Sequence, residues 1–132
     1  MADRTAKLTI GDNSYLMTFG LGCLARLNQK YVTEKEGIKL SVGIPNAMAE
    51  LALGNFEVVA DLIRFSTADN VNRPSEKEIE AYIDMRDQED DTTVFDDFLT
   101  YLKMVPGARR FFKEAEVAQQ EMEKVEKKIT KK

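Results

Sequence analysis

The 132-residue chain contains no histidine and no tryptophan, and it has a single cysteine, Cys23. Without histidine, the chain lacks the most common general base at neutral pH and the most common transition-metal ligand. One cysteine cannot form an internal disulfide. Cys23 lies in the apolar stretch "GLGCLA", and free cysteines in such stretches are usually buried. We therefore predict that Cys23 is a core residue and that the chain carries no histidine-dependent catalysis.

The chain also lacks long hydrophobic runs and a recognisable leader. No segment reaches the length of about 18 apolar residues that a membrane-spanning helix needs. The first residues, "MADRTAKLTI", lack the apolar stretch and small cleavage-site residues of a signal peptide. Hydrophobic residues make up 43% and charged residues 32% of the chain, which suffices for one domain with a solvated surface. The expectation is a soluble, cytoplasmic protein that does not contact membranes.

Charge is distributed unevenly although the net charge is only −4. Residues 1–68 are neutral overall, residues 69–97 contain eleven acidic and three basic residues, and residues 98–132 contain nine basic and five acidic ones. An acidic middle argues against a general nucleic-acid-binding protein. The pattern is compatible with head-to-tail self-association, with a partner of mixed charge, or with charged surfaces that only face solvent.

The first part of the chain predicts a β-hairpin followed by a helix. Leu8 and Ile10 alternate with polar residues, a turn-rich cluster follows at 11–14, and alternation resumes from Tyr15 to Phe19. A lone hairpin is marginal in water, so other elements must cover it. The next segment, "FGLGCLARLNQKY", has an apolar helical stripe formed by Leu21, Leu24, Leu27 and Tyr31. Residues 32–43 resemble a loop, with a short strand possible over 38–42.

The central part predicts four helices. "FEVVADLIRFS" is the most hydrophobic helical segment and is expected to lie at the centre of the core; another helix, with Pro45 in its first turn, precedes it. In "NRPSEKEIEAYID", Ser75 and Glu78 have the spacing of a capping box, which starts a helix. A polar, acidic linker follows, and then "TVFDDFLTYLKMV" predicts a helix capped by Asp91 or Thr92.

The last segment predicts a long, basic helix with a short heptad seam. Its apolar positions recur at spacings of four and three residues, and the seam residues are Phe111, Ala115, Ala118, Met122, Val125 and Ile129. The seam is a candidate surface for self-association or for a partner, although a helix that simply projects into solvent gives the same pattern. We expect an α+β protein, mainly α-helical: an N-terminal β-hairpin packed on about five to six helices, with residues 1–106 as a body and 107–132 as the C-terminal helix.

The acidic residues between 87 and 97 do not form a recognisable metal or catalytic motif. An EF-hand loop that began at Asp87 would need glycine in the sixth place and glutamate in the twelfth. Those places hold Thr92 and Phe98. Gly20 and Gly22 lack the rest of a dinucleotide-binding motif. We therefore expect no enzyme activity, no metal and no cofactor.

The order and spacing of these segments resemble the tail assembly chaperones of long-tailed phages and prophages of Gram-positive bacteria. The opening "KLTIGDNSYLMTFGLGCLARLNQKY" resembles their strand, turn, second strand ending in Phe-Gly and amphipathic helix. The resemblance continues through "VVADLIRFSTADN", "NRPSEKEIEAYID", the acidic gap and "FDDFLTYLKMVP". The matching positions at the start are Leu8, Ile10, Gly11, Asp12, Tyr15, Phe19, Gly20, Leu24 and Leu27.

The resemblance implies a non-catalytic protein that binds the tape measure protein, a very long and largely helical chain. It implies that the chaperone keeps this client soluble until the major tail protein polymerises around it and displaces the chaperone. It further implies a homo-oligomer, a place in the cytoplasm of the bacterial host, absence from the mature virion, and a longer frameshifted product that contacts the major tail protein. Two other classes stay open: a small structural phage protein, such as a scaffold or connector, and an acidic regulator that mimics nucleic acid.

Overall fold

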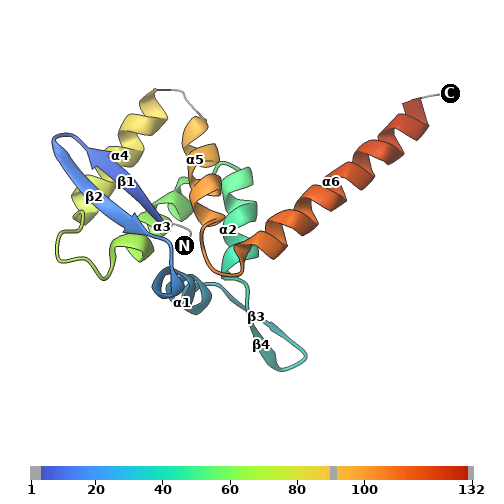
Figure 1. Cartoon of the computed structure of the whole chain (residues 1–132), viewed down its shortest axis with the longest axis horizontal. Coiled ribbons are helices and arrows are strands. Elements are labelled where there is room, and N and C mark those ends of the chain that lie inside the picture. The colour runs from blue at the N-terminus through green and yellow to red at the C-terminus, as the bar shows by residue number, and fades with distance from the viewer. Residues whose placement is uncertain (1–3, 90–91, 131–132) are drawn as a thin grey trace.

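The computed structural model describes residues 4–89 and 92–130, and the side chains of residues 126–130 lie outside this description. Within these residues the chain forms two β-hairpins and six α-helices (Figure 1). The predicted α+β class is confirmed, including its N-terminal hairpin, its helical bundle and its long C-terminal helix. The elements in chain order are β1 Thr5–Ile10, β2 Asn13–Thr18, α1 Leu21–Lys30, β3 Val32–Lys35, β4 Ile38–Ser41, α2 Gly43–Ala52, α3 Phe56–Thr67, α4 Glu76–Gln88, α5 Thr93–Leu102 and α6 Ala108–Thr130.

The N-terminal hairpin pairs β1 with β2 in antiparallel register, from Thr5 opposite Thr18 to Ile10 opposite Asn13. Its turn consists of Gly11 and Asp12 alone, so it is shorter than the predicted one, and Gly11 has a φ of +58°, which glycine adopts without strain. Every second side chain points to the same face. That face is buried and packs against α3 and α4, which supplies the cover that a two-stranded hairpin needs.

Helix α3 lies at the centre of the core, as predicted. It packs against β2, α1, α2, α4 and α5. Asn55 caps its start, since the Asn55 side chain accepts a hydrogen bond from the Glu57 backbone N–H at 3.0 Å. Eight of its twelve residues are buried, namely Val58, Val59, Ala60, Asp61, Leu62, Ile63, Ser66 and Thr67. Only Glu57 and Arg64 of this helix are exposed, so the buried polar residues need partners within the protein.

Asp61 is the charged residue of α3 that is buried, with 2% of its surface exposed. Its carboxylate accepts hydrogen bonds from Lys30 Nζ at 2.5 Å, from the Tyr31 hydroxyl at 2.6 Å and from the Arg64 guanidinium at 2.9 Å. Burial, together with the hydrogen bond to Asp61, raises the pKa of Tyr31, so its hydroxyl stays a donor at neutral pH. These contacts join the end of α1 to the middle of α3.

The predicted capping box at the start of α4 is present. The Ser75 hydroxyl accepts from the Glu78 backbone N–H, and the Glu78 carboxylate accepts from the Ser75 backbone N–H, each at 3.1 Å. The same carboxylate also accepts from the Tyr15 hydroxyl at 2.5 Å and from Asn13 at 3.4 Å, both on β2. Glu78 therefore caps the helix and ties it to the N-terminal hairpin.

Residues 32–41 correct one prediction. They form a second antiparallel hairpin, with Glu36 and Gly37 in its turn at φ values of +53° and +78°. Two positive φ values at the central positions are typical of a type I′ turn. The strand β3 was missed because "VTEK" holds a single apolar residue and every residue of both strands is exposed, so no burial pattern is present in the sequence.

The predicted stripe on α1 is wrong at its first position. Leu21 is 72% exposed, whereas Cys23 and Leu27 are buried. These two residues are four apart and share one helical face, so Leu21 lies off the face that meets the core. The burial predicted for Cys23 is confirmed.

Thr92, one of the two caps predicted for α5, occupies the N-cap position without a side-chain capping hydrogen bond. Asp91, the alternative cap, lies outside the described residues.

At the C-terminal end of α5, Pro106 and Gly107 separate this helix from α6. Ala108 is fully buried, and Phe111 and Phe112 are half-buried against the core. The first turn of α6 thus packs on the body, and the proposed boundary between 106 and 107 stays a prediction.

Replacing Asp61 with alanine should destabilise the protein far more than replacing Asp69. Both carboxylates pair with an arginine or lysine at 2.5 Å, but the side chain of Asp61 is 3% exposed and that of Asp69 is 74% exposed. Asp61→Ala removes the acceptor of the Lys30 ammonium and the Tyr31 hydroxyl, while Arg64 keeps Glu76, and it should cost about 1–3 kcal/mol. Asp69→Ala removes a surface ion pair, worth about 0–1 kcal/mol. Urea unfolding measures both, and equal losses would contradict a structural role for the Asp61 contacts.

The Glu78 contacts should make stability depend on pH in the acidic range. The hydrogen bond from Tyr15, followed by that from the Ser75 backbone, lowers the pKa of Glu78 below its usual 4.5. The native state therefore favours the ionised form, and this stabilisation is present above pH 4.5 and is lost as pH falls through the lowered pKa. Glu78→Gln should be less stable than wild type at pH 7, and the gap should narrow towards pH 3. Denaturant melts at several pH values measure this, with the exposed Glu80→Gln as control; a gap that stays constant would contradict the prediction.

Candidate interaction surfaces

Helix α6 carries the seam predicted from the sequence, and it projects away from the body (Figure 1). Phe111 is half-buried against the core, but Ala115 and Ala118 are exposed. Further along, Met122 is 66% exposed and Val125 is 56% exposed. The side chain of Ile129 lies outside the described residues. The described part of the seam beyond Phe111 is therefore an apolar line that no other described residue covers.

The heptad pattern missed one apolar residue of this helix. Val117 is 48% exposed and lies beside Ala118, on the flank of the seam. Because the helix repeats every 3.6 residues, Val117 and Glu121 share a face next to the seam residues. The apolar surface of α6 is thus wider than a strict two-position seam, as it is for helices that pack into a groove.

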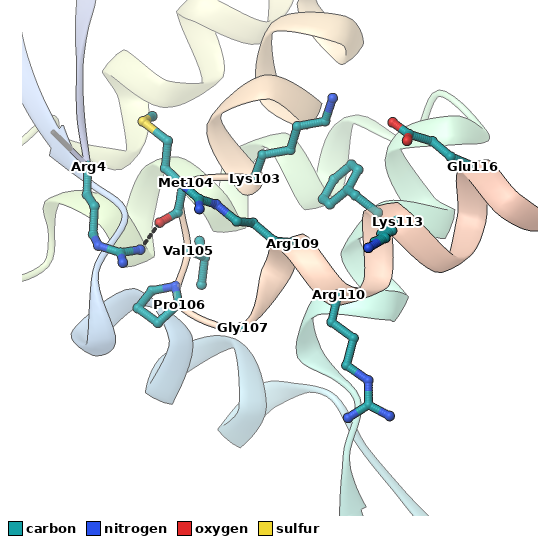
Figure 2. A pocket seen from close by; sticks show the side chains of 11 residues that line it. Arg4, Lys103, Met104, Val105, Pro106, Gly107, Arg109, Arg110, Lys113 and Glu116 are labelled. Carbon is teal, nitrogen blue, oxygen red and sulfur yellow. Dashed lines mark hydrogen bonds between the residues drawn. The ribbon is translucent and has the colours of Figure 1, made fainter. Parts of the chain in front are cut away.

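A second surface lies at the corner between α5 and α6, which forms a hollow of about 920 Å³. Five cationic side chains line it, and we call them the basic corner: Arg4, Lys103, Arg109, Arg110 and Lys113. Figure 2 shows them around the turn that contains Pro106 and Gly107. The Arg4 guanidinium donates a hydrogen bond to the Met104 carbonyl, which holds the start of β1 at this corner. The basic tail was predicted from the sequence, but the addition of Arg4 was not.

Within the described residues, most cations of the basic corner have no acidic partner. Arg110 forms an ion pair with Glu114 at 3.3 Å, and Lys103 lies over the Phe112 ring at 5.2 Å from its centre. No ion pair within the described part of the chain involves Arg109 or Lys113, which are four residues apart on α6. The lining includes one acid, Glu116, so the corner has a clear excess of positive charge.

A third surface is the exposed face of α4. Glu80, Asp84 and Asp87 recur at spacings of four and three residues and are all exposed, so they form one line along the helix. We call them the acidic stripe. The ion pairs of this region involve other carboxylates, since Arg86 pairs with Glu89 at 3.8 Å and with Asp97 at 3.5 Å. The stripe therefore presents unneutralised negative charge.

The β3–β4 hairpin is a fourth exposed surface. Thr33 lies opposite Leu40, and Lys35 lies opposite Ile38, so these four side chains share one face. Ile38 and Leu40 are exposed large apolar residues. Figure 1 shows the hairpin extending from the body between α1 and α2. This face was not predicted, because only the second of its two strands was expected from the sequence.

Cys23 has the properties of a structural residue. It is 1% exposed, and burial raises the pKa of its thiol to about 12. A thiol with this pKa is protonated at neutral pH and is a poor nucleophile.

Among the residues that the structure describes, no group of three histidine, cysteine, aspartate or glutamate side chains is placed to hold a metal ion. In the same part of the chain, no helix combines the length and apolarity needed to cross a bilayer.

The class defined by these features is a small helical protein whose exposed apolar and charged surfaces suit contacts with other proteins. A family model described as "Phage tail assembly chaperone protein, TAC" matches residues 7–116. The match covers most of the chain, and the protein belongs to this family. It contains the two hairpins, α1 to α5 and the first turns of α6. No curated protein and no solved structure shows significant similarity to the chain.

Family membership gives the chain a chaperone role in phage tail assembly and implies that it interacts with tail proteins. The family resemblance predicted from the order of segments is confirmed. The family is described by an assembly role and not by an enzyme class. Of the seam residues, Phe111 and Ala115 lie within the matched range, and the rest of the seam lies beyond residue 116.

Proposed function

We propose that this chaperone binds the tape measure protein and keeps it soluble in the cytoplasm of the phage's bacterial host, which we expect to be Gram-positive. The major tail protein then displaces it as the tail tube polymerises, so the chaperone is absent from the mature virion. The protein acts by binding, as a homo-oligomer and without a cofactor or catalysis. A longer frameshifted product, if translated, adds a segment that contacts the major tail protein.

The observation that carries this proposal is the exposed apolar seam on a projecting helix. A long, apolar, helical client needs its apolar face covered, and an amphipathic helix covers such a face by packing side chains at positions three and four apart. Met122 and Val125, with Val117 beside them, offer apolar side chains of this kind at the surface. Large apolar side chains exposed along one helix favour a partner over solvent.

The body of the protein anchors α6 at its first turn and leaves the rest of the described helix exposed. Its core holds α1 to α5 and the N-terminal hairpin, and the first turn of α6 is anchored there by Ala108, Phe111 and Phe112. The remaining described part of α6 is exposed. This division lets the seam bind a client while the body stays folded and soluble.

Co-expression with the tape measure protein of the same phage tests the proposed function. The expected result is that the client, insoluble alone, becomes soluble and co-purifies with the chaperone. Adding the major tail protein should release the chaperone from the complex, which size-exclusion chromatography would detect. An insoluble client with no complex would refute the proposal.

The seam itself is tested by substitution, because deletion of 107–132 would also remove Ala108 and the two phenylalanines that pack on the body. Met122→Ser/Val125→Ser should weaken client binding at least about tenfold, since each lost apolar contact is worth about 1 kcal/mol or more. The control is Gln120→Ser/Glu123→Ser, which changes two exposed residues on the other side of the same helix. Pull-down with titrated client measures the difference. Equal binding by both variants would show that the seam is passive.

A further inference from the structure

We infer that the basic corner of one copy of this chain receives the acidic stripe of a second copy, in a head-to-tail contact. This deepens the proposed function, which requires several copies along one client, by naming the surfaces that join them. It concerns self-association alone, so it can be tested without the client.

The first support is that the two surfaces carry opposite, unneutralised charges of matching spacing. Arg109 and Lys113 lie four residues apart on α6, and Glu80 and Asp84 lie four residues apart on α4. In an α-helix this spacing separates side chains by about 6 Å along the axis. Two exposed helices with these patterns can therefore face each other with two oppositely charged pairs in register. Lys103 lies in the same hollow and is available for a third acid, Asp87.

The second support is that one copy cannot join its own two surfaces. Figure 1 is drawn with the longest axis horizontal, and it places α4 at one side of the body while α6 leaves from the other. Helix α5 connects them: it follows α4 in the chain and ends at Leu102, directly before Lys103. Each copy therefore has one surface free for the copy before it and the other free for the copy after it.

A contact between two different surfaces is heterologous, and it produces rings or open chains, whereas a two-fold contact stops at a dimer. The hollow at the basic corner is concave and of about 920 Å³, whereas the acidic stripe lies along an exposed helix, so the shapes are also complementary. A second copy fits the corner better than an uncharged apolar partner, because apolar contact would leave Arg109 and Lys113 buried without acids.

The contact is tested with paired charge reversals in the full-length chain, by sedimentation analysis at several protein concentrations. Arg109→Glu/Lys113→Glu reverses the corner, and Glu80→Lys/Asp84→Lys reverses the stripe. Each variant should self-associate at least about tenfold more weakly than wild type, because attraction becomes repulsion at two pairs. Wild-type self-association should also weaken between about 0.05 M and 0.5 M salt, since salt screens exposed charges.

Two further samples separate the contact from a general effect of charge. An equimolar mixture of the two variants should associate again, because each then offers a surface of opposite charge to the other. The fourfold variant that carries both reversals should likewise associate with itself. Lys35→Glu/Lys39→Glu, on the exposed β3–β4 hairpin, is the matched control and should associate like wild type. Circular dichroism confirms that every variant keeps its helices.

A monomeric wild-type protein, reversals without effect, or a mixture that fails to associate would each overturn the inference. Loss of client binding without loss of self-association in the corner variant would also overturn it, because the corner would then belong to the client. A different result would refute the proposed function alone. If copies associate as described but the tape measure protein stays insoluble, the contact between copies is supported and the proposed client is wrong.

Discussion

The burial of α3 on nearly every side is the constraint on which the rest of the structure depends. A two-stranded hairpin and a set of short helices have little stability of their own in water. Each of them gains a partner by packing on α3, which contacts β2, α1, α2, α4 and α5. Because Asp61 lies almost fully buried within this packing, its charge must be neutralised by neighbouring residues, and Lys30, Tyr31 and Arg64 fulfil this need. The polar contacts thus follow from the apolar packing.

The elements that the sequence predicted best are those whose pattern reports burial or a local hydrogen bond. The N-terminal hairpin alternates, α3 is apolar over its length, and Ser75 with Glu78 forms a box within four residues. The features that were not predicted lack such a pattern in the sequence. Strand β3 is exposed throughout, and the exposure of Leu21 depends on how α1 is rotated against α3, which is a tertiary property. The same reasoning explains the surfaces: the seam is periodic in sequence, whereas the basic corner combines Arg4 with residues about a hundred positions later.

Structure and family together describe a protein that separates stability from binding. The core is built from α1 to α5 and the first hairpin, with the first turn of α6 packed on it. The candidate surfaces are formed by side chains outside this core: those of the outer part of α6, of the solvent-facing side of α4 and of the cations around the turn after α5. Charge and apolar contact are also separated, since the seam is apolar and the corner and stripe are ionic. One chain can therefore present an apolar surface and two charged surfaces to other proteins at the same time.

The projection of α6 has an energetic consequence of its own. A single helix without tertiary support is only marginally stable in water, and the exposed part of α6 receives no support from the body. A partner that binds the seam must therefore also meet the entropic cost of ordering the helix. The net affinity is lower than the area of the contact alone would produce. Contacts made through the seam are therefore broad in area but modest in affinity.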